Sequence, residues 1–219
     1  MLQPKIRPNV PVNSLKLPFV SEIDFDTVLS GDIINSHYPG VKFEAIPLPN
    51  TQGTIPHNVF ASDAFDQTNA DSPPNVITIS QPPHGAAFNE SGGAIRATFN
   101  SPQLYVSIDV RPLVQSAEHF NPDPGALPYL SAFGEPIILI SPAEIVPKLG
   151  TMFFPLSNQD PQFTKSWRRI EFVSTSQTPN IYSVVFSCVY TGNGTSILAL
   201  FDRFRFSPTL PLPATHFIG

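Results

Sequence analysis

Three carboxylates and an amide lie between residues 63 and 71. Asp63, Asp66 and Asp71 stand there with Asn69. Oxygen atoms of this kind are the ligands that calcium takes in proteins, and binding residues concentrate in loops. The spacing differs from that of an EF-hand loop. We therefore interpret the stretch in two ways, as a second candidate calcium site or as an acidic loop that serves solubility alone.

Catalytic motifs are scarce in this chain. The five histidines stand apart from one another, and the sequence contains no His-x-His, His-Glu-x-x-His, Gly-x-Ser-x-Gly or Gly-rich phosphate loop. Paired carboxylates of the glycosidase kind depend on tertiary proximity, so no spacing reveals them. We expect a protein that is not an enzyme, and a hydrolase of unknown type stays open as the third alternative.

Aromatic side chains near predicted loops are the candidates for contact with a ligand. Sugar rings carry C–H patches that stack on aromatic faces and hydroxyls that need polar partners. The candidates are Trp167, Tyr38, Tyr129 and Tyr190. Trp167 is the strongest, because Lys165, Ser166 and Arg168 surround the only tryptophan. Half-buried packing in a sandwich explains such aromatics equally well.

Charge and cysteine content exclude several classes of protein. Only 12 Lys and Arg stand against 17 Asp and Glu, and Trp167-Arg168-Arg169 is the nearest approach to a basic cluster. We therefore expect no nucleic-acid partner. Cys188 is the only cysteine and lies in an apolar run, so we expect a buried thiol, no intrachain disulfide and no multi-cysteine zinc site.

Neither a membrane span nor a signal peptide is visible in the chain. No uninterrupted apolar stretch approaches the roughly 18 residues that a transmembrane helix requires. The first residues, from Met1 to Pro8, lack the apolar run of a secretory signal. We expect a chain that does not cross a membrane.

Proline sets the limits of secondary structure. The chain has 26 prolines among 219 residues, spread from Pro4 to Pro213. Proline removes a backbone donor and clashes inside a helix, so few windows can hold three or four helical turns. We expect strands and loops, with one short helical turn at 116–120.

Alternation of apolar and polar residues, closed by turn-forming residues, predicts a series of short strands. They lie at 19–26, 41–46, 57–61, 75–80, 94–99, 104–110, 129–133, 137–140, 170–174, 181–190 and 197–206. The first two are able to pair, and we expect the last two to form a hairpin across Gly192-Asn193-Gly194. The stretch from Phe172 to Phe201 carries no charge, which predicts central strands buried on at least one face.

These strands predict an all-β fold. We expect an antiparallel β-sandwich, jelly-roll-like, with long loops and little helix. It would form a single domain at 19–207, preceded by a proline-rich segment at 1–18 and followed by a tail at 208–219.

Several stretches together resemble a known family. They are Ile23-Asp24-Phe25-Asp26, Tyr38-Pro39-Gly40-Val41-Lys42-Phe43, Arg96-Ala97-Thr98-Phe99, Val106-Ser107-Ile108-Asp109-Val110 and Ala199-Leu200-Phe201-Asp202-Arg203-Phe204-Arg205-Phe206. The acidic first strand, the Tyr-Pro-Gly before a strand and the Phe-Asp in the last strand are similar to bacterial jelly-roll modules of the galactose-binding-like type, akin to carbohydrate-binding modules. The insertion at 111–128 departs from that pattern.

The resemblance implies a carbohydrate or cell-surface glycan as partner, and an extracellular or cell-surface location. It also implies a structural calcium between the first and last strands. The matching positions are Asp24, Asp26 and Asp202, with Glu44 as a weaker addition. Arg203 stands where relatives often carry a second acid. The alternative is that these carboxylates face solvent or pair with neighbouring arginines.

The leading hypothesis is thus a non-catalytic, lectin-like carbohydrate-binding module. A structural or adhesive domain that self-associates, or contacts another protein through the uncharged stretch at 172–201, is the second hypothesis. A partner could therefore be a glycan, a second copy of the chain, or another protein.

Overall fold

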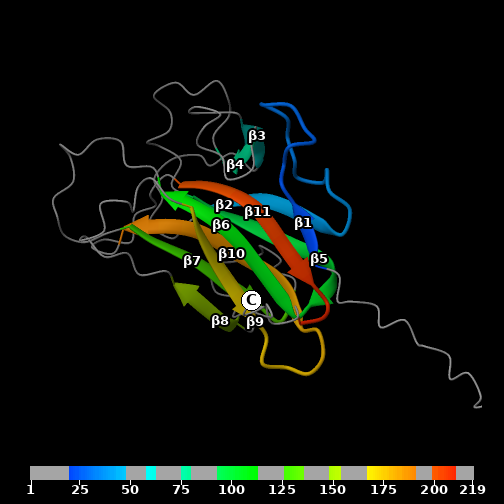
Figure 1. Cartoon of the computed structure of the whole chain (residues 1–219). Coiled ribbons are helices and arrows are strands. Elements are labelled where there is room, and N and C mark those ends of the chain that lie inside the picture. Colours follow the sequence, from blue (N-terminus) through cyan, green and yellow to red (C-terminus); the bar gives the residue numbers. More distant parts are fainter. Residues whose placement is uncertain are drawn as a thin grey trace, which may run out of the picture.

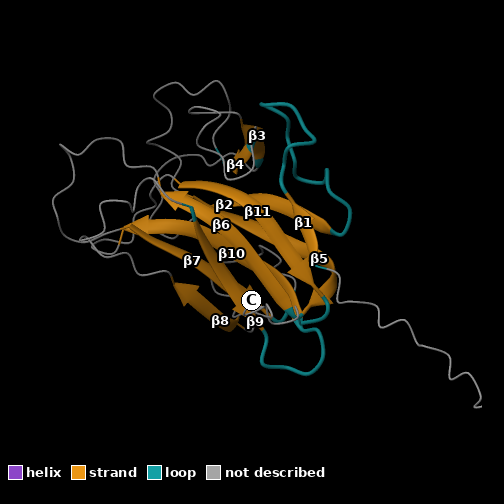
Figure 2. Cartoon of the chain, viewed as in Figure 1, coloured by secondary structure: helices purple, strands orange, loops and turns teal. Residues whose placement is uncertain are grey.

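The computed structural model describes residues 20–47, 58–62, 75–79, 93–112, 126–135, 148–153, 167–190 and 199–210. These ranges contain eleven strands and no helix (Figures 1 and 2). The strands are β1 Ser21–Ile23, β2 Val41–Pro47, β3 Phe60–Ser62, β4 Val76–Thr78, β5 Gly93–Gln103, β6 Tyr105–Pro112, β7 Ala126–Phe133, β8 Lys148–Phe153, β9 Arg168–Val173, β10 Ile181–Tyr190 and β11 Ala199–Ser207.

The strands form two antiparallel sheets. One has the order β3-β4-β11-β6-β9, with β1 beside β11, and the other has the order β2-β5-β10-β7-β8. Figure 1 shows the first sheet in front of the second. Apolar side chains from both sheets form one core cluster between them. The structure therefore confirms the predicted all-β antiparallel sandwich.

Phenylalanine rings join the two sheets. Phe204 of β11 lies 5.3 Å from Phe43 of β2 and 5.9 Å from Phe186 of β10, measured between ring centroids. Phe99 stacks on Phe204 at 6.0 Å with an interplanar angle of 13°. Fully burying one such ring contributes about 1.5–3 kcal/mol. The phenylalanines of the sequence thus hold the sandwich together.

The uncharged stretch lies where the sequence predicts. β10 is the central strand of its sheet, between β5 and β7, and its described side chains are buried from Ser183 to Cys188. Cys188 is fully buried in the core, as expected. The Tyr38-Pro39-Gly40 segment leads into β2, and Gly40 has the positive φ of 88° that favours glycine there.

Two predictions of pairing are wrong. β1 pairs with β11 and β2 pairs with β5, so the first two strands are not partners. β10 and β11 lie in different sheets, so they do not form a hairpin. Adjacent strands in a sandwich often cross between the sheets, and alternation along one strand carries no information about its partner.

Strand boundaries also differ in places. β8 was not predicted at all, because its alternation is broken by Gly150 and by a bulge at Leu149. The strand predicted at 137–140 and the helical turn at 116–120 lie outside the described residues. No helix of the described part is long and apolar enough to cross a membrane.

Candidate functional site

An aromatic pair marks the outer face of the five-stranded sheet at its β8 side. Tyr129 of β7 is opposite Phe153 of β8, and their ring centroids are 6.4 Å apart at an interplanar angle of 50°. Phe153 is 52% exposed, whereas Tyr129 is half-buried. Burial raises the pKa of Tyr129 to about 12, so its phenol stays neutral at physiological pH.

Hydroxyl groups occupy the next row of the same face. Ser131 and Thr151 are opposite each other on β7 and β8, and their hydroxyl oxygens are 2.8 Å apart. We call Tyr129, Ser131, Thr151 and Phe153 the β8 margin. Its four side chains combine an exposed ring with hydroxyls that both donate and accept, and none of them carries a charge.

Exposure on this face rises toward β8. Val185 and Ser187 of the central strand β10 are only 7% and 3% exposed, although their side chains point away from the main core. Ile46, Ala94 and Val185 form a second apolar cluster there, with Tyr129 and Phe133 packed against it. The edge strand is therefore where a ligand can reach this face.

A glycine lets β8 lie close to the other sheet. A Cβ atom added to Gly150 would stand 2.8 Å from the Phe172 ring of β9, well inside the ordinary contact distance. Leu149 is the extra residue of a bulge, because Ala132 pairs with Gly150 while Phe133 pairs with Lys148. Gly150 and the bulge together determine how β8 presents Thr151 and Phe153.

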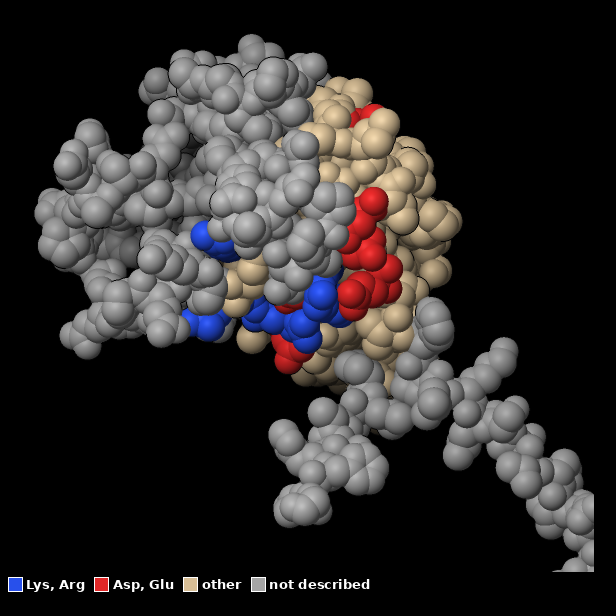
Figure 3. Space-filling view, turned by 45° about the horizontal axis from the view of Figure 1, so that its top comes forward, with Lys and Arg blue, Asp and Glu red and all other residues tan. Residues whose placement is uncertain are grey.

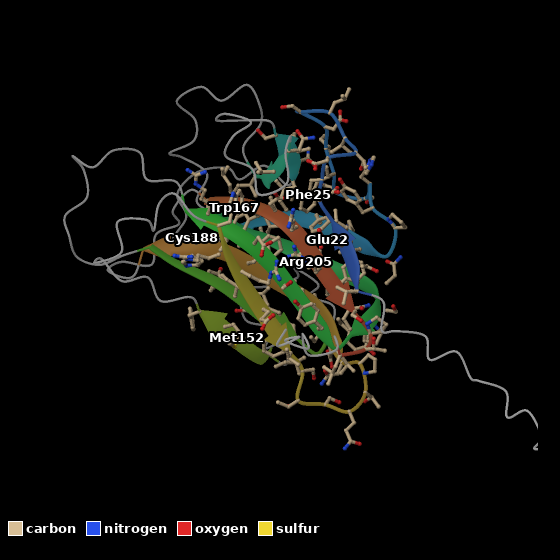
Figure 4. All side chains as sticks on the ribbon, viewed as in Figure 1. Glu22, Phe25, Met152, Trp167, Cys188 and Arg205 are labelled. Atoms are coloured by element: carbon tan, nitrogen blue, oxygen red, sulfur yellow. The ribbon has the colours of Figure 1, made fainter. Side chains whose placement is uncertain are left out.

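The predicted ligand-binding aromatics are not brought together. Tyr38 packs against the core, with its ring centroid 5.6 Å from that of Phe25. Trp167 precedes β9 in the other sheet and is partly buried (Figure 4). Tyr190 ends β10, and its side chain is outside the described part. Of the three whose side chains are described, Tyr129 lies at the β8 margin.

Phe153 was missed by the sequence analysis. The only signal available was the apolar run Met152-Phe153-Phe154 immediately before Pro155. A run of that length fits a buried segment as well as an exposed edge strand. Only the pairing of β8 with β7 shows that Phe153 and Tyr129 share one face.

The predicted acidic residues Asp24, Asp26 and Asp202, which we call the acidic junction, lie in or directly after two strands that pair, β1 and β11. Asp24 and Asp26 follow β1, and both the Asp24 and Arg203 charges act on Asp26. Burial raises the pKa of Asp26, the Asp24 charge adds to that rise, and a hydrogen bond from the Asn75 backbone N–H opposes it. Asp202 is fully buried in β11, and its Oδ1 accepts the Arg203 N–H at 2.7 Å.

Backbone strain accompanies this acidic junction. Phe25 and Arg203 have positive φ values of 63° and 45°, in the left-handed region that non-glycine residues rarely adopt. The Asn75 amide donates to the carbonyl oxygens of Phe25 and Val28, at 3.2 and 2.7 Å. Hydrogen bonds from Asn75 thus hold the turn that follows β1.

The donors of the junction do not form a metal cage by side chains alone. Within the described ranges, no three His, Cys, Asp or Glu side chains gather so that they could hold a metal ion. Glu44 lies in the other sheet, where Lys42 and Arg96 donate hydrogen bonds to it. Asp63, Asp66 and Asp71 of the second candidate site lie outside the described residues.

Ion pairs run across four strands of the other sheet. Arg205 of β11 donates to Glu22 of β1 at 2.7 Å and to Asp109 of β6 at 3.0 Å. Arg169 of β9 donates to the same Asp109 at 2.9 Å, and this bond raises the pKa of Arg169. Figure 4 shows Glu22 beside Arg205, and Figure 3 shows basic and acidic side chains in contact on one face.

We call Glu22, Arg205, Asp109 and Arg169 the ion-pair ladder. It includes Arg169, one of the two arginines of the basic cluster in the sequence. Arg169 is paired with Asp109, and Glu171 accepts a hydrogen bond from the Tyr105 hydroxyl at 3.3 Å. Acidic and basic groups therefore alternate across the sheet, which differs from the one-signed stripe of a nucleic-acid-binding surface.

Comparison with known proteins gives no family. No family model matches the chain, and no curated protein matches it. Among solved structures, an arabinose-bound α-L-arabinofuranosidase is similar at a TM-score of 0.44 and 14% identity, over 85% of this chain and 26% of that one. An adhesin domain of Lys-gingipain from Porphyromonas gingivalis is similar at a TM-score of 0.38 and 10% identity, over 88% and 99% of the two chains.

Proposed function

We propose that this protein is a non-catalytic, lectin-like carbohydrate-binding module that holds a glycan at the β8 margin. One observation carries the proposal: a half-exposed Phe153 ring, backed by Tyr129, stands beside the hydroxyl pair of Ser131 and Thr151. A sugar ring stacks through its C–H face on such an aromatic, while its hydroxyls bond to polar groups at the edge.

The chemistry of the margin favours a neutral sugar. None of its four side chains is charged, and the raised pKa of Tyr129 keeps that phenol protonated. The Thr151 and Ser131 hydroxyls are hydrogen-bonded to each other. A sugar hydroxyl would accept from or donate to this uncharged pair without the cost of desolvating an ion. An extracellular or cell-surface location follows from the same proposal, since exposed glycans are found there.

A glycan-array screen tests the proposal. We expect selective binding by the native chain and a loss of at least about tenfold in affinity for Phe153→Ala, because stacking on one aromatic is worth about 1–3 kcal/mol by truncation. Val173→Ala is the matched control, because Val173 is 45% exposed on β9 of the other sheet. Trp167→Ala distinguishes binding at the β8 margin from binding at Trp167, which is the strongest candidate from the sequence.

Three results would change the proposal. Binding that survives Phe153→Ala but fails in Trp167→Ala would move the site to the start of β9. Binding to no glycan would leave the structural or adhesive alternative. Release of reducing ends from a polysaccharide panel would instead identify a hydrolase.

Calcium at the acidic junction is the second part of the proposal. Asp24, Asp26 and Asp202 would have to exchange some of their present hydrogen bonds for the ion. The resemblance predicts a higher melting temperature in millimolar calcium than in chelator, since an ion that binds only the folded state stabilises it. An unchanged melting temperature would count against a calcium ion at the acidic junction.

A further inference from the structure

Five of the described strands lie at the edges of the two sheets, and they differ in how they are protected. β2 carries the Lys42–Glu44 ion pair, β9 carries two arginines and Glu171, and β1 and β3 are only three residues long. Charges and short length are the devices by which proteins prevent edge strands from pairing with other chains. β8 has a single charge, on Lys148 at its start.

β8 also concentrates exposed apolar side chains. Leu149, Met152 and Phe153 are 36%, 45% and 52% exposed, and they are three of the seven large apolar residues that the described part leaves exposed. Figure 4 shows Met152 at the margin of the molecule. β7 is the only strand that pairs with β8 among the described residues.

We propose that a second copy of this chain pairs with β8, antiparallel and about a two-fold axis. The register follows from side-chain alternation. If both copies keep their cores on the same side of the joined sheet, residues of equal parity must stand opposite each other. The register centred on β8 places Thr151 opposite Thr151 and Gly150 opposite Met152.

This register brings apolar side chains together. Met152 of each copy stands opposite Gly150 of the other, beside the partly buried Phe172 ring that covers that glycine. Phe153 of each copy comes beside the bulged Leu149 of the other. No pair of like charges is brought face to face within these residues. Cross-strand apolar pairs each contribute about 0.2–1 kcal/mol, in addition to the backbone hydrogen bonds.

The pairing closes as a dimer. A two-fold contact uses the same strand in both copies, and the remaining edges carry charges or are short. The bulge at Leu149 ends the regular edge on one side. A continuous ten-stranded sheet follows, with the two Phe153 rings on one face about 14 Å apart from strand geometry.

Sedimentation over a range of protein concentrations tests the dimer. The samples contain no glycan, so the result is independent of sugar binding. We expect the native chain to approach dimer mass as its concentration rises from about 1 to 500 µM, by mass action. Met152→Lys should raise the protein concentration needed for dimer formation at least about tenfold, because each dimer then places two positive charges at the contact. Val173→Lys, at an equally exposed site, should leave the curve unchanged.

A cysteine placed at the axis tests the register. Thr151→Cys should form a disulfide-linked dimer under mild oxidation, because directly opposite Cα atoms of an antiparallel pair lie about 4.5–5.5 Å apart, within the Cα separation that a disulfide spans. Cys188 is buried and does not compete. Val173→Cys is the control. The inference is overturned if the native chain sediments as a monomer at every concentration and Thr151→Cys links no faster than Val173→Cys. In that case the partner of the β8 edge would be a strand of another protein.

Discussion

Asp109 is the residue on which the ion-pair ladder depends. It is 3% exposed and accepts hydrogen bonds from both Arg169 and Arg205. Arg205 is itself buried and keeps only the half-exposed Glu22 as its other acidic partner within the described ladder. A buried charge that loses its partner costs far more than an exposed ion pair contributes.

We expect Asp109→Asn to lower the free energy of unfolding by about 2–3 kcal/mol, because a buried carboxylate then loses its charge-assisted hydrogen bonds to two guanidinium groups. Urea unfolding with an unchanged m-value checks this. Lys42→Ala, which removes an exposed ion pair, should change stability by less than about 0.5 kcal/mol. Equal effects of the two variants would show that the ladder is solvated.

At the scale of elements, β8 depends on its contact with β9. Gly150 faces the Phe172 ring so closely that a methyl group would need the ring to move. The partly buried ring can shift more easily than backbone, so the cost is limited. This contact fixes the position of the strand that carries both the proposed glycan site and the proposed dimer edge.

Gly150→Ala should therefore destabilise the fold by about 1–2 kcal/mol. The same change in a Phe172→Leu background should cost clearly less, because the shorter side chain makes room for the methyl group. Thermal unfolding of the four proteins completes the double-mutant cycle. Additive effects would mean that the ring does not oppose the added methyl group.

At the scale of the whole molecule, charge works against self-association. The chain has a formal net charge of −5, so two copies repel each other at low ionic strength. The proposed contact is apolar and hydrogen-bonded, and salt screens the general repulsion without weakening the contact itself.

The dimer fraction should therefore rise with salt. Raising sodium chloride from about 20 to 300 mM shortens the screening length from over 20 Å to below 8 Å. Sedimentation at a fixed protein concentration measures the change. A dimer that dissociates with salt would instead point to a contact between the charged edges, such as β9 with its arginines.

Much of the architecture could be predicted from the sequence. Proline spacing excludes long helices, alternation predicts most strands, and the uncharged run predicts the buried central strand β10. These features are local, because each depends on the backbone preferences and side-chain pattern of neighbouring residues. The burial of Cys188 follows from the same pattern.

Tertiary structure decided which strands pair and which side chains meet. Tyr129 and Phe153 are 24 positions apart in the sequence, and they share a face only because β7 pairs with β8 in that register. Glu44 is a candidate calcium ligand by sequence. Its strand β2 lies in the other sheet from β1 and β11, and its carboxylate accepts hydrogen bonds from Lys42 and Arg96. Alternation along a strand determines which residues share its face, whereas long-range packing selects the neighbour, and so the site is a property of the assembled sheets.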